Sequence, residues 1–290
     1  MFEKVLVPVD FSQGFGILID AVKEIPEIRE IVLLHVVYNR YPSKDPAIVH
    51  PDVEEARAAL ADMKNSFAMP GVVITDIVEE ITGGDISDVI NRTAIRLGIS
   101  LIVMGRRGTG IIETLLLGSV ASDILRYGKT DLFLIPTPFK YRDDPPKPDI
   151  PRPPLFSHVM VCTDFSEPEI GSICLKELPW IRRVSFFHSV TTGNSEDEIQ
   201  SAVAAAESGL GKIRDAFTRR GIPAHIHVSV GSAAEEILTF SRKEDISLIL
   251  LKSVGKKSLL NILIGSTSAP VARNTGKPVL ILKRPPVVRT

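Results

Sequence analysis

One segment pattern occurs twice in this 290-residue chain, and the repeat limits the possible folds more than any other feature of the sequence. Residues 5–12 (VLVPVDFS) match residues 159–166 (VMVCTDFS), and both apolar runs end in Asp-Phe-Ser. The separation drifts only from 154 residues (159 against 5) to 147 residues (264 against 117), as small loop insertions would cause. The chain is therefore predicted to fold as two homologous domains. Further matches follow in the same order: 33–36 with 186–189, Gly83 with Gly231, 100–104 with 247–251, and 117–119 with 264–266.

A proline-rich segment separates the two copies. Residues 136–154 contain eight prolines, which lack the backbone N–H that a helix or a sheet requires. An extended, semi-rigid linker is the favoured interpretation, and a ligand for a proline-recognising module is the alternative. We expect a first domain at 1–138, a linker at 139–154 and a second domain at 155–290.

Short apolar runs alternate with helix-period segments in each copy, which is typical of βαβ units around a parallel sheet. Ser12, Ser166 and Asp52 are the expected helix N-caps. The helix after the second strand should bury one stripe, made of Val53, Ala56, Leu60, Met63 and Phe67. The expected strands of the first copy, which the second mirrors, are 4–9, 31–37, 72–81, 101–104 and 132–135.

The composition is that of a folded globular protein, with 44% hydrophobic and 24% charged residues. The formal net charge of -1 gives no global field that favours nucleic acid or an anionic membrane. The longest apolar runs, such as 248–251, fall far short of the roughly 20 residues that span a bilayer. Cys162 and Cys174 form no CxxC motif and no signal peptide is recognisable, so free thiols and a cytoplasmic location are expected.

Glycines, a hydroxyl and a carboxylate form the strongest candidate binding site. Gly105 and Gly108 follow a predicted buried strand, and Gly118-Ser119 opens a helix after nine further residues. Glycines let a backbone approach a ligand closely, and a helix N-terminus favours a phosphate. Asp10 ends the first strand, where it could accept a hydrogen bond from a ribose hydroxyl or contact a phosphate-bound metal. Taken singly, glycines at such turns are often purely conformational.

Competing motifs are not supported. Gly14 and Gly16 are followed by Ile19 where a dinucleotide fingerprint has its third glycine, and residues 255–258 (GKKS) lie after Leu250 where a P-loop has glycine. No nucleophile has a neighbouring histidine and acid. We therefore expect a protein that is not an enzyme, with slow ATP hydrolysis as an alternative.

The histidines are interpreted mainly as structural. His35 and His188 end matching apolar strands and are expected to be packed and hydrogen-bonded rather than ligands. His225 and His227 share one face of a strand, but no acidic or cysteine cluster completes a metal site around them. No metal is expected at these positions.

The candidate-site residues resemble the universal stress protein family. Its hallmark is G-x2-G-x9-G-(S/T) after the fourth strand with an Asp after the first, and the first copy matches at Gly105, Gly108, Gly118, Ser119 and Asp10. The resemblance covers both copies. It implies an α/β fold of two tandem doubly wound domains, each a five-stranded parallel sheet in the order 3-2-1-4-5 flanked by helices. It also implies an intrachain pseudo-dimer of the two domains, with a homodimer of chains as a further option.

In the nucleotide-binding branch of this family the motif holds adenosine phosphates. The resemblance therefore implies ATP, ADP or AMP as the ligand, with Mg²⁺ accompanying ATP, and a role in stress or energy status. Arg107 lies inside the loop, where it could reach phosphate or be a solvated cation. The implied site consists of Pro8, Val9, Asp10, Val36, Met104, Gly105, Arg107, Gly108, Gly118, Ser119 and Val120.

The second copy departs from this motif at one position. Lys252 stands where the first glycine is expected, so a weaker site is predicted there. A tandem scaffold that binds no nucleotide and acts through protein partners is the alternative for the whole chain. The residues of the weaker site are Asp164, Gly255, Gly265 and Ser266.

Overall fold

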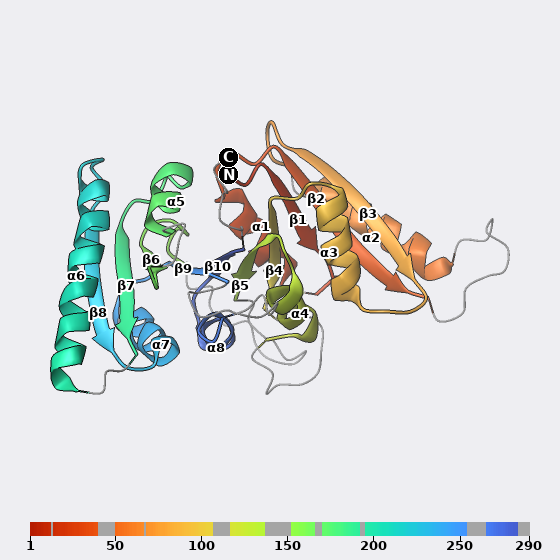
Figure 1. Ribbon diagram of the computed structural model, residues 1–290. Coiled ribbons are helices and arrows are strands. Elements are labelled where there is room, and N and C mark those ends of the chain that lie inside the picture. The colour runs from red at the N-terminus through yellow and green to blue at the C-terminus, as the bar shows by residue number, and fades with distance from the viewer. Residues whose placement is uncertain are drawn as a thin grey trace, which may run out of the picture. The chain divides into compact units, whose positions relative to one another are not determined.

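The computed structural model contains two α/β units, Met1–Thr137 and Pro138–Thr290, and each is described by itself (Figure 1). The predicted linker at 139–154 lies largely outside the part of the chain that the structure describes. The residues described are 1–12, 14–39, 50–66, 68–106, 117–136, 152–165, 170–191, 195–253 and 265–283.

The first unit is a parallel sheet of five strands joined by helical crossovers. Strand order is β3-β2-β1-β4-β5, which confirms the predicted 3-2-1-4-5 arrangement. Helix α2 packs on β2 and β3, and α3 packs beside α4. The elements are β1 (Lys4–Pro8), α1 (Phe15–Lys23), β2 (Glu30–Tyr38), α2 (Pro51–Ser66), β3 (Val73–Ile81), α3 (Ile86–Arg96), β4 (Leu101–Gly105), α4 (Ser119–Tyr127) and β5 (Asp131–Ile135).

The second unit repeats this topology. Its strand order β8-β7-β6-β9-β10 is equivalent to that of the first unit, and its pairs are also parallel. Helix α6 packs on β7 and β8, and α7 packs beside α8. The elements are β6 (Val159–Cys162), α5 (Ile170–Glu177), β7 (Val184–Val190), α6 (Glu196–Thr218), β8 (Ala224–Val230), α7 (Ala233–Lys243), β9 (Leu248–Lys252), α8 (Ser268–Asn274) and β10 (Val279–Leu282).

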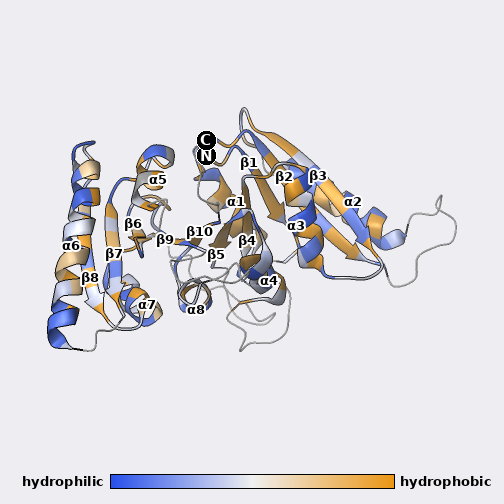
Figure 2. Ribbon diagram, viewed as in Figure 1, coloured by the Kyte–Doolittle hydropathy of each residue, from blue (hydrophilic) through white to orange (hydrophobic). Residues whose placement is uncertain are grey.

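The core of each unit lies on both faces of the central strands. Every residue of β6 is buried, as is all of β4 except Gly105, whereas β3 and β8, at one end of their unit's strand order, are mostly half-buried. In Figure 2 the central strands are mostly apolar, whereas the helices carry hydrophilic stretches. This pattern is expected when helices cover both faces of a parallel sheet.

The predicted core stripes are largely confirmed, but the first-unit helix caps are wrong. Val53, Ala56 and Leu60 are buried, whereas Phe67 lies outside the described residues. The N-cap of α1 is Gly14 instead of Ser12, because the Ser12 N–H bonds to the Asp10 carboxylate (3.0 Å) in a turn before the helix. Asp52 lies inside the first turn of α2, which begins at a proline suited to that position. Ser166 is outside the described residues.

Candidate functional site

Four segments of the first unit end or begin at one edge of its sheet. Strand β1 lies between β2 and β4, and all three run in the same direction, so their carboxyl ends meet. Asp10 follows β1 and is exposed, whereas Val36, near the end of β2, is half-buried. Helix α4 begins just beyond the segment that leaves β4. This edge is where open α/β sheets bind ligands.

Backbone and side-chain contacts with β2 hold the end of β1. The Val9 N–H donates to the Leu34 carbonyl at 2.8 Å, and the His35 Nδ1 donates to the Val9 carbonyl at 2.7 Å. Phe11 then adopts a positive φ of 55°, and its ring centroid lies 4.4 Å from that of His35. Asp10 is therefore carried by a turn that is fixed on both sides.

Two hydrogen bonds join the segment after β4 to the end of β5 and to the start of α4. The Arg106 N–H donates to the Ile135 carbonyl at 3.0 Å, and the Gly118 N–H donates to the Arg106 carbonyl at 2.7 Å. Gly118 is the N-cap of α4, and the first turn of this helix contains no acidic residue. Since a glycine offers no side chain to accept from the first N–H groups of a helix, this N-terminus is suited to an anion.

The predicted residues differ in how they reach solvent at this edge. Ser119 is exposed and Gly118 and Val120 are half-buried, so the start of α4 is accessible. Met104 is 8% exposed and Val9 is 6% exposed. Only a small part of either side chain could therefore contact a ligand. Pro8 and Gly105 are half-buried. Arg107 and Gly108 lie outside the described residues.

The second unit keeps the same connection between its fourth strand and the next helix. The Ser253 N–H donates to the Leu282 carbonyl at 2.9 Å, and the Gly265 N–H donates to the Ser253 carbonyl at 2.6 Å. However, α8 begins only at Ser268, after Ser266 and Thr267, and the Ser268 hydroxyl donates to the Lys252 carbonyl at 2.8 Å. The equivalent helix of the first unit begins directly after its glycine. Gly255 lies outside the described residues.

The turn after β6 also resembles its counterpart in the first unit. The Thr163 carbonyl accepts from His188 Nδ1 at 2.8 Å, and Phe165 has the same φ of 55° as Phe11. In this turn the Thr163 hydroxyl also accepts from the Phe165 N–H at 2.9 Å. Asp164, the predicted site residue of this turn, is half-buried.

The phenylalanine-histidine pairs are the local feature that sequence reasoning missed. His35 and His188 are hydrogen-bonded and half-buried, as predicted, but their contact with Phe11 and Phe165 was not foreseen. The sequence did contain a sign of this contact, because Asp-Phe-Ser and the histidine at the end of the second strand are both repeated in the two copies.

Neither cysteine forms a disulfide, and both are buried. Burial raises the pKa of the Cys162 thiol far above its ordinary value, so this group is an unreactive apolar side chain at the position of Pro8. Burial also lowers the pKa of His227, whose ring stacks on Phe187. Across the described residues, no group of three or more His, Cys, Asp or Glu side chains is placed to hold a metal ion.

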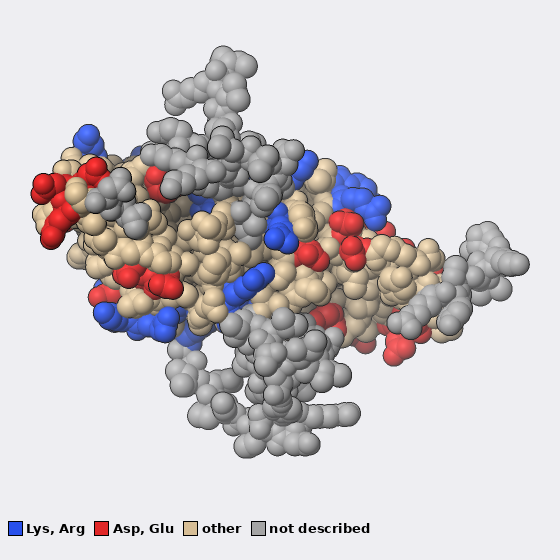
Figure 3. All heavy atoms as spheres, turned by 60° about the horizontal axis from the view of Figure 1, so that its bottom comes forward, with Lys and Arg blue, Asp and Glu red and all other residues tan. Residues whose placement is uncertain are grey.

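Charged side chains are distributed in small groups of both signs on the face shown in Figure 3. Among the helices of the described segments, none has the length and apolar character needed to cross a membrane.

Comparison with known proteins gives a consistent picture. The family model described as "Universal stress protein family" matches residues 1–136 and 182–283. A universal stress protein of Synechocystis sp. is 24% identical over 241 residues, covering 79% of this chain and 72% of that protein. A universal stress protein of Methanocaldococcus jannaschii is 33% identical over 79 residues, covering 27% of this chain and 46% of that protein.

Solved structures share the fold over nearly the whole chain. The crystal structure of a universal stress protein from Archaeoglobus fulgidus has a TM-score of 0.64 at 23% identity, covering 97% of this chain and 96% of that one. A putative universal stress protein from Pseudomonas aeruginosa has a TM-score of 0.65 at 15% identity, covering 97% and 93%. Because the family model matches most of both units, the chain belongs to the universal stress protein family.

Proposed function

We propose that this chain is an adenine-nucleotide-binding stress-response protein whose nucleotide is held mainly at the carboxyl edge of the first unit. Membership of the universal stress protein family supports the stress-response role. The observation that carries the nucleotide proposal is the placement of the accessible start of α4 beside the end of β4, by the bond from Gly118 to Arg106. Phosphate would accept from the first N–H groups of this helix.

The other end of the proposed ligand lies toward β1 and β2. Asp10, exposed on its fixed turn, would accept from ribose, and the strand end at Val36 would contact adenine. ATP, ADP and AMP all share this adenosine part, and Mg²⁺ would accompany the phosphates of ATP. The protein would act in the cytoplasm as a binding module, with nucleotide occupancy as its signal.

The second unit is proposed as the weaker site. Its helix begins two residues farther from the glycine, at Ser268 instead of Ser266, and Lys252 occupies the position of Gly105. Slow ATP hydrolysis is a second candidate activity. It would require turnover that depends on Asp10 and on a divalent metal.

The first experiment is to denature the purified full-length protein and to identify and count the released small molecules. About one adenine nucleotide per chain is expected, and titration with ADP should refill the site. Gly118→Val should abolish binding, because a branched side chain would fill the space at the helix start. The matched change Gly265→Val in the second unit should leave most binding intact. No nucleotide in the preparation and no binding of ATP, ADP or AMP on titration would contradict the proposal.

A further inference from the structure

We propose that His35 is a positioning residue for the nucleotide site, which aims Asp10 at the ribose by holding the end of β1. This inference rests on the proposed function. Its basis is that a β2 side chain and the β2 backbone both bind the residue that precedes Asp10, through His35 Nδ1 to the Val9 carbonyl and Val9 N–H to the Leu34 carbonyl.

The geometry leaves Asp10 little freedom. Its carboxylate accepts from the Ser12 N–H at 3.0 Å, and Phe11, packed on the His35 ring, holds the positive φ that bends the chain there. A positive φ is costly for a bulky residue and persists only where surrounding contacts enforce it. His35 supplies two of these contacts, one polar and one aromatic.

The test measures the preference of the full-length protein for ADP over 2′,3′-dideoxy-ADP, because this ratio reports the ribose contact of Asp10. His35→Leu should reduce the preference by roughly tenfold or more, as expected for losing a hydrogen bond to a charged group. His35→Asn, whose amide can donate near the Nδ1 position, should restore most of it. As a control, His225→Leu changes an exposed histidine of β8 outside both proposed sites and should leave the ratio unchanged.

Two results would overturn this role. One is a His35→Leu protein that remains folded and keeps the full ribose preference. The other is a loss that affects ADP and the dideoxy nucleotide equally and is not rescued by His35→Asn, which would indicate a merely structural role. If either result is found and the wild-type protein still binds ADP, the proposed function is retained and only the role of His35 is refuted. Wild-type protein that binds neither nucleotide would refute both.

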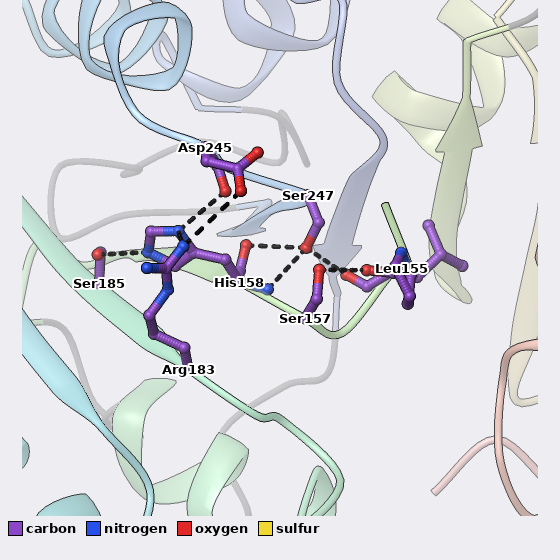
Figure 4. Close-up of polar contacts among 8 residues, drawn as sticks. Leu155, Ser157, His158, Arg183, Ser185, Asp245 and Ser247 are labelled. Atoms are coloured by element: carbon purple, nitrogen blue, oxygen red, sulfur yellow. Dashed lines mark hydrogen bonds and ion pairs between the residues drawn. The ribbon is translucent and has the colours of Figure 1, made fainter. Parts of the chain in front are cut away.

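A separate observation concerns the amino-terminal edge of the second unit, where a buried histidine joins three segments (Figure 4). His158, only 4% exposed, places Nε2 at 2.8 Å from the Ser185 hydroxyl. Its Nδ1 lies 2.9 Å from the Asp245 carbonyl and 2.7 Å from Nη2 of Arg183. The first unit has Lys4 at the equivalent position, paired with Glu30 at 2.9 Å.

Nδ1 of His158 faces one acceptor and one donor, and it can satisfy only one of them at a time. A guanidinium can only donate, so its bond to Nδ1 requires that nitrogen to be unprotonated. The Asp245 carbonyl can only accept, so its bond requires Nδ1–H. When the neutral ring carries its proton on Nε2 and donates to the Ser185 hydroxyl, Nδ1 is free to accept from Arg183, whereas the protonated ring donates from both nitrogens. From this difference we infer that His158 is an acid-sensitive latch of the second unit, in which protonation exchanges Arg183 for the Asp245 carbonyl.

The charges around the ring fit this exchange. Burial and the charge of Arg183 lower the pKa of His158 below its ordinary value of 6.5, while Asp245 and Glu244 oppose the shift. Arg183 is 42% exposed, and its Nη2 already lies 4.0 Å from the Asp245 carboxylate. The released guanidinium therefore has both solvent and a nearby carboxylate available.

The second unit also contains a natural fluorescence reporter. Trp180 is the single tryptophan of the chain, and its ring meets that of Phe156 edge-on at 6.0 Å. The Phe156 carbonyl accepts from the Arg182 N–H at 3.0 Å. The fluorescence of Trp180 therefore reports unfolding of the second unit.

The latch predicts that the second unit becomes less stable as the pH falls below about 6.5, because the unfolded chain then binds a proton that the folded chain resists. Urea unfolding followed by Trp180 fluorescence between pH 7.5 and 5.5 should show this, with at most about a tenfold change in the unfolding constant per pH unit. Replacing the imidazole in His158→Gln should flatten the dependence. The control His227→Gln removes another histidine with a lowered pKa. It should leave unchanged the part of the pH dependence of stability that His158 causes.

NMR titration of the His158 ring in the full-length protein tests the exchange itself. Arg183→Gln should raise the pKa of His158 relative to the wild-type protein, because the competing cation is removed. An unchanged His158 pKa in Arg183→Gln would overturn the latch. So would a pH dependence in His158→Gln equal to that of the wild type.

Discussion

The carboxyl edges of the two units share one backbone frame and differ in what that frame presents. In both units the glycine before the last helix donates to the residue just beyond the fourth strand, at 2.7 Å from Gly118 and 2.6 Å from Gly265. The strand itself ends in Gly105 in the first unit and in Lys252 in the second. Backbone hydrogen bonds therefore preserve the connection, while the residue that ends the fourth strand differs between the units.

The amino-terminal edges differ in a similar way. Ser100 and Ser247 both tie the start of the first strand to the segment before the fourth strand. The second unit has a buried histidine, His158, where the first has a half-buried ion pair between Lys4 and Glu30. Both units thus keep the serine that joins the first strand to the segment before the fourth, and they differ in the side chains around it.

Exchange of the residue that ends the fourth strand should have the largest effect. Gly105→Lys should weaken ADP binding by roughly a hundredfold, as expected when a side chain blocks a close backbone approach worth about 3 kcal/mol. Lys252→Gly should improve binding by the second unit much less, because α8 still begins at Ser268. Titration calorimetry of both variants checks this. Equal affinity in wild type and Gly105→Lys would place the nucleotide elsewhere.

Close packing of α5 on α6 distinguishes two glycines of the second unit. A Cβ at Gly171 would lie 2.4 Å from Cγ2 of Ile213, whereas one at Gly211 would meet only Nη2 of Arg214, at 3.9 Å. Gly171→Ala should destabilise the second unit by about 1–3 kcal/mol through overpacking. The matched Gly211→Ala should stabilise α6 by about 0.5–1 kcal/mol. Urea unfolding followed by Trp180 fluorescence measures both, and equal effects would contradict the close packing.

The serines at the amino-terminal edges should give the smallest difference. Ser247 is 3% exposed and contacts both Leu155 and His158, whereas Ser100 is half-buried and contacts Lys4. Ser247→Ala should cost about 1 kcal/mol more than Ser100→Ala, because more buried partners lose a hydrogen bond. Calorimetric unfolding of the two variants gives the comparison. A larger loss in Ser100→Ala would reverse the proposed order.

Local periodicity made most of the fold predictable. The strand from 31 to 37 was found within one residue at each end, as β2 runs Glu30–Tyr38. Caps were less predictable: a serine followed by a helix pattern suggested a cap at Ser12, but the Asp10 turn placed the helix start at Gly14. Ser195, which caps α6 through the Glu198 N–H, was not singled out. Which residue caps a helix depends on the conformation of the loop that precedes it.

Local patterns repeated along the chain were enough to predict the two βα repeats, the buried strands and one candidate site that includes Asp10, Gly105 and Gly118. The sheet order was expected from the family resemblance, and the topology bears it out. In contrast, the folded chain was needed to show that His35 binds the Val9 carbonyl and that His158 lies between Arg183 and Asp245. These contacts join residues 25 to 87 positions apart, so strand order and register bring them together.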